Sequence, residues 1–333
     1  MLSNQTTGKL FRTYNNNPAL YYAKSYLNQA FPGILFRKQL DAELKLAEKY
    51  DPEVIRTRLN YYNKLSGINP LAGNPPTLGS QTIPKRQKVY YFDMYEFSRY
   101  FNPELYAGYA FGDVTHVPEQ PAFVKSRPIA GNNTNSVVLK LEKMRHFNFI
   151  NDPVTFDKKQ NLLIGMAFVD QPHRVLFMEK HFNNPLCRLG QINLGTTHDH
   201  WYKPKISIRE HLNYKFILTL EGNDVATSLK WVMSSGSIAV MPLPTYETWF
   251  MEGMLIPDFH YIKIEKDYSD LDEKLNYYIN HPDKAREIIK NAHQYIQQFR
   301  NTELEKILSL LVLKKYFVCT GQMESDKLLE SYL

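Results

Sequence analysis

Residues 214–241 read YKFILTLEGNDVATSLKWVMSSGSIAVM, and this stretch decides the fold. The apolar run 216–220 predicts a buried strand, and a polar turn follows it at 221–224. Residues 225–235 predict a helix that ends at Gly236, and residues 237–241 predict a second strand. A strand, a tight turn, a helix and a strand form a βαβ unit, and such units build parallel sheets.

The start of this predicted helix is a candidate anion-binding site. It lies at the carboxyl end of a strand, where open α/β sheets bind ligands. The backbone amides of Ala226, Thr227 and Ser228 would be unpaired there, and Lys230 follows one turn later. In the alternative interpretation, Asp224 caps the helix and Lys230 is solvated. Spacing alone does not separate the two.

Composition indicates an ordinary globular protein. The chain has 333 residues, enough for two domains, with 43% hydrophobic and 22% charged residues. Its two cysteines, Cys187 and Cys319, indicate neither a disulfide framework nor a cysteine metal site. No signal-peptide pattern opens the sequence and no apolar run is long enough to cross a bilayer. We therefore expect a cytoplasmic protein.

Charge is concentrated at the N-terminus although the net charge is only +6. No acidic residue precedes Asp41, whereas five basic residues do: Lys9, Arg12, Lys24, Arg37 and Lys38. Such a segment fits an anionic membrane face or a phosphorylated acceptor, and the alternative is a plain solvated face. The sequence shows no nucleic-acid-binding motif, so we expect no nucleic-acid partner.

The remaining pattern predicts two α/β halves. Residues 88–92 predict a strand that ends at Asp93, residues 122–125 another strand, and residues 136–145 a helix. Residues 162–168 predict the first strand of a second unit, after a polar boundary at 151–160. Thr302 and Glu305 form the pattern of a capping box at the start of a last helix. The fold class is therefore α/β, with a cleft between two Rossmann-like domains.

Several common catalytic motifs are missing. The sequence contains no Gly-x-Gly-x-x-Gly fingerprint, Walker A loop, His-Glu-x-x-His or Gly-x-Ser-x-Gly. His116, His173 and His260 do not have the spacing of metal ligands. The sequence therefore gives no motif evidence for a dehydrogenase, a P-loop NTPase, a zincin or an α/β-hydrolase. No metal site is predicted.

Seven segments together resemble glycosyltransferase family 90, the CAP10-like group, and within it the bacterial branch that makes lipopolysaccharide core sugars. They are residues 111–113, 124–129, 145–147, 214–231, 235–240, 246–250 and 260–262. The resemblance implies a GT-B-type fold with domains at 1–155 and 156–300, and a helix at 301–333 that packs back on the first domain. It also implies a nucleotide-sugar donor, usually UDP-linked, in the cleft.

The resemblance assigns donor contacts to the organising stretch. Ala226, Thr227, Ser228 and Lys230 would hold the UDP phosphates, beside Gly222 and Asp224. Arg174 matches an arginine of the family, but residues 163–166 lack the first arginine of that segment, and Arg127 is a candidate replacement. Alternatively, Arg127 pairs with a buried carboxylate. Glu247 and Glu252 lie where such enzymes bind the nucleotide ribose.

An inverting transferase needs a general base for the acceptor hydroxyl. The family places an aspartate at a strand end in the N-terminal domain, which matches Asp93 first and Asp113 second. Either could instead cap a turn. We expect transfer of glucose or galactose from UDP-glucose or UDP-galactose to an inner-core heptose, at the cytoplasmic face of the inner membrane and without a required metal. The alternatives are another acceptor, such as a capsule glycan or a protein serine, and a non-catalytic binding protein.

Overall fold

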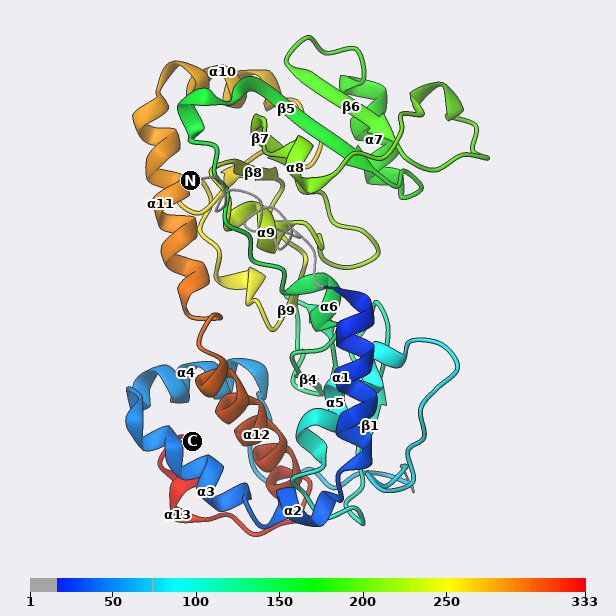
Figure 1. The fold of residues 1–333 in the computed structure, drawn as a ribbon, viewed down its shortest axis with the longest axis vertical. Helices are drawn as coiled ribbons and strands as arrows, with labels where there is room; N and C mark the ends of the chain where they lie inside the picture. The colour runs from blue at the N-terminus through cyan, green and yellow to red at the C-terminus, as the bar shows by residue number, and fades with distance from the viewer. Residues whose placement is uncertain (1–16, 74) are drawn as a thin grey trace, which may run out of the picture.

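Two separate parallel sheets form the framework of the molecule (Figure 1). The computed structural model describes residues 17–73 and 75–333. The larger sheet has five strands and the smaller has three. This confirms the predicted α/β class with parallel sheets.

The five-stranded sheet contains the organising stretch. In chain order its strands are β5 (Gln160–Ala167), β6 (Cys187–Gln191), β7 (Tyr214–Leu218), β8 (Ile238–Met241) and β10 (Ile262–Lys263). They lie side by side in the order β6-β5-β7-β8-β10, and every neighbouring pair is parallel. In sequence rank this order is 2-1-3-4-5, so the chain changes direction across the sheet between β5 and β7.

Helices connect and cover these strands. They are α7 (Pro172–His181), α8 (Ile208–His211), α9 (Leu229–Met233), α10 (Leu271–Asn280) and α11 (Pro282–Gln297). Single 3₁₀ turns lie at Phe156–Lys158, Asp199–Trp201 and Glu252–Met254. The two predicted strands of the organising stretch are confirmed as β7 and β8.

The helix of the organising stretch is shorter than predicted. It begins at Leu229 instead of residue 225, and Ser228 occupies the N-cap position. Asp224 does not cap it, because its carboxylate accepts a hydrogen bond from the Ser126 hydroxyl at 2.6 Å and lies 2.7 Å from the Lys125 ammonium. These contacts hold the loop before α9 toward the smaller sheet, so its residues do not join the helix. The interpretation of Asp224 as the cap, with Lys230 in solvent, was therefore wrong, because Lys230 is also fully buried. Anion binding by Ala226, Thr227 and Ser228 stays a prediction.

The smaller sheet contains β1 (Gly108–Ala110), β2 (Ala122–Val124) and β4 (Ser136–Val138), all parallel. Directly after β2, β3 (Ser126–Pro128) pairs antiparallel with β9 (Tyr246–Thr248). This two-stranded ribbon connects the chain of the smaller sheet to the segment that follows β8. It places residues of the two sheets next to one another.

Helices from both ends of the chain surround the smaller sheet. They are α1 (Pro18–Ala30), α2 (Gly33–Arg37), α3 (Leu40–Lys45), a 3₁₀ turn at Leu46–Lys49, α4 (Pro52–Tyr62), α5 (Lys88–Ser98), α6 (Lys143–His146), α12 (Thr302–Cys319) and α13 (Lys327–Glu330). Asp51 caps α4 and Pro52 starts it. The apolar helix α12 packs against α3, α4 and α5, so the chain end returns to the N-terminal helices (Figure 1).

Three local predictions were wrong in this half. Residues 88–92 belong to helix α5, not to a strand; they read as a buried strand because α1 and α12 both pack on α5 and bury consecutive residues. Residues 136–145 form β4 and the short α6, since Val137 and Val138 pair with β2. The cap of α12 is Asn301, because Glu305 turns inward to Arg58, at 2.6 Å.

No helix among the described residues is both long and apolar enough to span a bilayer. Lys9 and Arg12 of the basic segment lie outside the described residues. The domain limits 1–155, 156–300 and 301–333 stay predictions.

Candidate active site

A cavity of about 580 Å³ lies at the carboxyl ends of β5, β6 and β7. It is therefore at the switch point of the sheet, where doubly wound folds bind their ligands. Residues 165–171 line one side and residues 222–225, 227 and 228 another, while Asp113 and Lys125 enter from the smaller sheet. Six of the predicted site residues meet there: Asp113, Arg174, Gly222, Asp224, Thr227 and Ser228.

An ionic cluster at this cavity joins the two sheets. The Lys125 ammonium lies 2.6 Å from a carboxylate oxygen of Asp113 and 2.7 Å from one of Asp224. Asn223 donates to the other oxygen of Asp113 at 3.2 Å. The Lys125 side chain is 2% exposed, whereas that of Asp113 is 37% exposed. We call Asp113, Lys125 and Asp224 the open cluster, because the Asp113 side chain is partly exposed at the cavity.

The open cluster keeps Asp113 ionised. Burial alone would raise the pKa of Asp113, but the hydrogen bond and the charge of Lys125 outweigh it and lower that pKa. Burial opposes the charge of Lys125, yet Asp224 and its other partners raise the pKa of the ammonium. A carboxylate that is ionised at neutral pH and open to a cavity can accept a proton from a bound hydroxyl group.

Helix α6 adds an unusual histidine to the cavity wall. His146 is 1% exposed, and neither ring nitrogen makes a hydrogen bond to a described residue. Burial lowers its pKa to about 4, so the ring is neutral at pH 7. Glu142 lies 3.3 Å from it and 2.6 Å from Arg145. Burial would raise the pKa of Glu142, but His146, Arg145 and Lys125 outweigh it and lower that pKa to about 2.

Arg174 organises the loops on the other side of the cavity. Its guanidinium donates to the carbonyls of Glu221, Phe168 and Leu220 at 2.8, 2.8 and 2.9 Å. It thereby ties the loop after β5 to the loop after β7. Gly222 lies beside it, since a Cβ there would be 3.5 Å from the guanidinium. Two N–H groups of Arg174 remain for a ligand, because a guanidinium has five.

The first turn of α7 faces the same cavity. Gln171 is its N-cap residue, no acidic side chain lies in the turn, and Gln171 and Arg174 both line the cavity. Lys205 and the hydroxyl-bearing residues Thr227 and Ser228 also line it. A helix start with basic and hydroxyl side chains suits an anionic ligand. Two helix starts therefore reach this cavity: Gln171 and Arg174 at the start of α7, and Ser228, the N-cap residue of α9.

Four other predicted residues form pairs away from the large cavity. Arg127 is fully buried; it contacts Glu247 at 2.7 Å and donates to the carbonyls of Tyr61 and Ser136 at 2.6 and 3.1 Å. Tyr61 also donates to Glu247. Lys230 is fully buried and pairs with Glu252. We call Arg127, Glu247, Lys230 and Glu252 the closed cluster, because each is at most 2% exposed.

Asp93 lies inside α5 and does not line the large cavity. One carboxylate oxygen accepts from the Tyr21 hydroxyl at 2.8 Å and the other from the Lys143 amide at 2.9 Å. It is 1% exposed, and burial raises its pKa even though Lys143 opposes the shift. Asp93 therefore connects α1, α5 and α6. The predicted position at a strand end was wrong.

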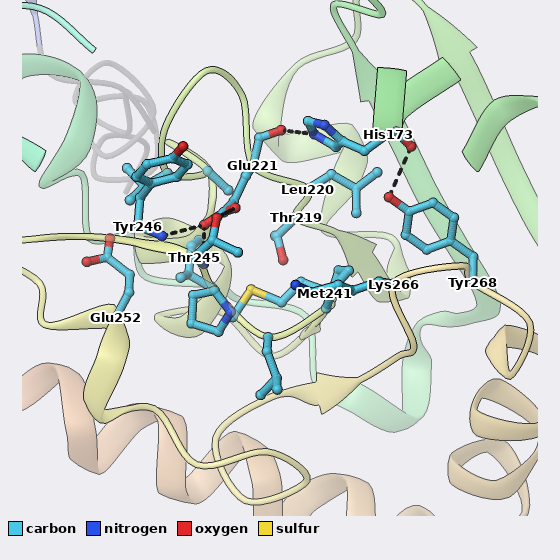
Figure 2. A pocket seen from close by; sticks show the side chains of 16 residues that line it. His173, Thr219, Leu220, Glu221, Met241, Thr245, Tyr246, Glu252, Lys266 and Tyr268 are labelled. Carbon is cyan, nitrogen blue, oxygen red and sulfur yellow. Dashed lines mark hydrogen bonds between the residues drawn. The ribbon is translucent and has the colours of Figure 1, made fainter. Parts of the chain in front are cut away.

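A second, smaller cavity of about 240 Å³ lies on the other side of the loop after β7 (Figure 2). Ala226 and Glu252 are among its lining residues. Glu221 braces one wall, because its carboxylate accepts from the Thr245 and Tyr246 amides at 2.8 and 3.1 Å. His173 contacts the Glu221 carbonyl at 2.8 Å and so fixes the same loop. This cavity adjoins the switch-point cavity across a loop that both share.

Three residues of the site, Lys125, His146 and Lys205, were missed from the sequence. Lys125 lies inside a quoted family motif, and its neighbour Arg127 was chosen instead. His146 likewise stands in a quoted motif, but a lone histidine gives no signal of its burial. Among residues 17–73 and 75–333, no group of three His, Cys, Asp or Glu side chains could hold a metal ion.

The fold and the cavity define an α/β protein with a ligand site at a topological switch point. The sequence profile described as Glycosyl transferase family 90 matches residues 181–316. O-glucosyltransferase LpsA from Dichelobacter nodosus is 41% identical over 308 residues, which cover 88% of this chain and 94% of that protein. The uncharacterized protein 179R of Invertebrate iridescent virus 6 is 29% identical over 132 residues, 36% of this chain and 11% of that protein. The chain is a glycosyltransferase and belongs to glycosyltransferase family 90.

Proposed function

We propose that this enzyme is an inverting hexosyltransferase that moves glucose from UDP-glucose to an inner-core heptose of lipopolysaccharide or lipooligosaccharide. The name of the Dichelobacter relative, an O-glucosyltransferase, favours glucose over galactose. The similarity covers nearly the full length of both proteins. We further propose that the enzyme works at the cytoplasmic face of the inner membrane, where it would act as a peripheral protein.

We place the donor in the switch-point cavity, and the basic lining of that cavity is the observation that carries the proposal. The α7 start, Arg174 and Lys205 offer positive charge on one wall. Thr227 and Ser228 offer hydroxyl groups beside them. Together they would hold the UDP diphosphate and stabilise it as it departs, without a required metal. Gly222 leaves room beside Arg174 for that ligand.

The arrangement of the two sheets supports a GT-B-type enzyme with its donor between two domains. The larger sheet would belong to the nucleotide-sugar domain and the smaller sheet to the acceptor domain. Asp113 and Lys125 reach the cavity from the smaller sheet, and the loops after β5 and β7 reach it from the larger one. The closed cluster would then support the junction of the two halves instead of contacting the donor.

We assign the general base to Asp113 in preference to Asp93. Asp113 is ionised and reaches the cavity, whereas Asp93 is buried and each of its oxygens already accepts a hydrogen bond, from Tyr21 or Lys143. Asp113 would take the proton of the acceptor hydroxyl, and the oxygen of that hydroxyl would attack the anomeric carbon of the donor sugar. The bond from that carbon to the phosphate oxygen would break on the opposite face. UDP would leave with the bonding electron pair, into the field of Arg174 and Lys205.

Hydrolysis and transfer with a panel of UDP-sugars would test this function. Purified protein is incubated with truncated lipooligosaccharide, capsule glycan or a serine peptide, with and without EDTA. We expect transfer from UDP-glucose to lipooligosaccharide that EDTA does not abolish. Transfer from UDP-galactose alone, or loss of transfer in EDTA, would contradict the donor or the metal-independent mechanism. Transfer to the serine peptide or the capsule glycan alone would contradict the acceptor.

A further inference from the structure

The outer face of α1 is apolar, although it faces solvent. Leu20, Leu27 and Phe31 are 69%, 64% and 54% exposed and follow one another at helical spacing. Three neighbours extend this surface: Tyr26, Ile34 and Leu35, at 45%, 48% and 50% exposure. We call these six residues the apolar surface. They are six of the twenty large hydrophobic side chains that are exposed among the described residues.

The orientation of α1 is fixed by its inner face. Tyr21 donates to Asp93, and the rings of Tyr22 and Phe92 meet edge to face at 6.2 Å. Ser25, one turn after Tyr21, is also buried, and α1 packs against α5. The helix therefore has an inner face that packs on the protein and an outer face that exposes Leu20 and Leu27. Tyr26 lies at the border of the two faces, because its ring also meets Phe92 edge to face at 5.0 Å. A surface helix normally carries polar residues on that outer face.

Positive charge accompanies the apolar surface. Lys24 lies between Leu20 and Leu27 on α1, and Arg37 and Lys38 close α2. No acidic residue occurs from residue 17 to residue 40. Helices that lie in a bilayer interface combine apolar side chains with lysine and arginine, which attract anionic lipid headgroups.

A short chain of contacts leads from this surface to the cavity. Tyr21 of α1 binds Asp93 of α5, and Asp93 accepts from the Lys143 amide at the start of α6. His146, at the other end of α6, lines the switch-point cavity. A membrane that contacts α1 would therefore lie two helices away from the cavity (Figure 1).

We propose that the apolar surface of α1 and α2 docks on a bilayer that contains anionic phospholipids. Both the charge and the exposed side chains fit this occupant, and a second copy of the chain would bring the same positive charge and be repelled. The inference deepens the proposed action on a lipid-linked acceptor. Its test measures vesicle binding, so it can fail or succeed independently of transferase activity.

Sedimentation with vesicles tests the proposal on the full chain. The wild type is mixed with phosphatidylcholine vesicles and with vesicles that also contain phosphatidylglycerol. We expect binding to the anionic vesicles, and at least about a tenfold loss in the triple variant Leu20→Ser, Leu27→Ser, Phe31→Ser, because each substitution removes apolar area from the interface. The double variant Lys24→Ala, Lys38→Ala should weaken binding by about fivefold per lysine.

A matched control has the same number of exposed apolar side chains elsewhere on the molecule. Ile68, Leu194 and Ile256 are 66%, 62% and 54% exposed, and their triple serine variant should bind vesicles as the wild type does. Equal losses in both triple variants, or wild-type protein that ignores anionic vesicles, would overturn the proposal. So would a wild-type dimer that the α1 variant converts to a monomer, because the surface would then bind a second copy.

Discussion

The open and closed clusters both pair basic side chains with carboxylates, but only the open cluster has a carboxylate that is partly exposed. In the closed cluster, Arg127 binds a carboxylate and two carbonyls, and Glu252 accepts from Thr248 as well as from Lys230. In the open cluster, Lys125 is just as buried, but its partner Asp113 is 37% exposed toward the cavity. Pairing alone therefore does not mark a catalytic residue. A buried ion pair with one exposed member can react with a bound ligand, whereas an ion pair with two enclosed members has a structural role.

The largest effect should come from breaking the closed cluster. Glu247→Gln leaves the Arg127 guanidinium buried without its countercharge, so the free energy of unfolding should fall by about 3–5 kcal/mol. Urea denaturation would measure this, and the activity per folded molecule should stay close to that of the wild type. Glu287→Gln, which removes an exposed ion pair with Lys284, is the control and should change little. A loss below about 1 kcal/mol for Glu247→Gln would contradict the structural role.

His146 should make stability depend on pH. Its folded pKa of about 4 is below the ordinary value of 6.5, so between these values the unfolded chain binds a proton that the folded protein does not. Stability is therefore complete above about pH 6.5 and falls as the pH drops toward 4, by roughly 2 kcal/mol at pH 5.

The variant His146→Phe removes that titration. Its unfolding free energy should fall less steeply than that of the wild type from pH 7 to pH 5. The charged groups that act on the ring, namely Glu142, Lys125 and Lys230, are unchanged in the variant. Parallel stability profiles for the two proteins would show that another group causes the acid loss.

Arg174 should give a smaller effect, on ligand binding. A lysine cannot hold three carbonyls and a phosphate together, so Arg174→Lys should raise the Kd for UDP about tenfold, or about 1.4 kcal/mol. Isothermal titration would measure it. The control, Arg286→Lys, changes an arginine that pairs with Asp157 on the surface. An unchanged Kd in Arg174→Lys would mean that Arg174 only braces the loops.

Three strands of the larger sheet, β5, β7 and β8, could be predicted from the sequence because they are short apolar runs between clear turns, whereas β6 is not an apolar run and was missed. β7 and β8 lie within one residue or two of their predicted positions. The half around α5 could not be predicted in the same way. Residues 89–94 are all buried, so their hydrophobic pattern has no periodicity that distinguishes a helix from a strand. Tertiary packing by α1 and α12 decides the outcome there.

The site was predictable only at the level of segments. Residues 222–225, 227 and 228 do line the cavity, and Ser228 is the N-cap residue of α9, but the start of α7 lines the same cavity and was not predicted as an anion site. Sequence spacing cannot show that Asp224 turns to Lys125 and Ser126, since these residues are about a hundred positions away. For the same reason, the sequence could not separate Arg127, which is enclosed, from Lys125, whose partner Asp113 is exposed.

The most direct test of this comparison is the rate of glucose transfer from UDP-glucose in Asp113→Asn and Asp93→Asn. Loss of a general base should lower kcat by about 10²- to 10⁴-fold in Asp113→Asn, with the Kd for UDP unchanged. Asp93→Asn, which keeps the shape of a buried side chain outside the cavity, should keep kcat within about threefold per folded molecule. The opposite pattern, a slow Asp93→Asn beside an active Asp113→Asn, would contradict the assignment of chemistry to the open cluster.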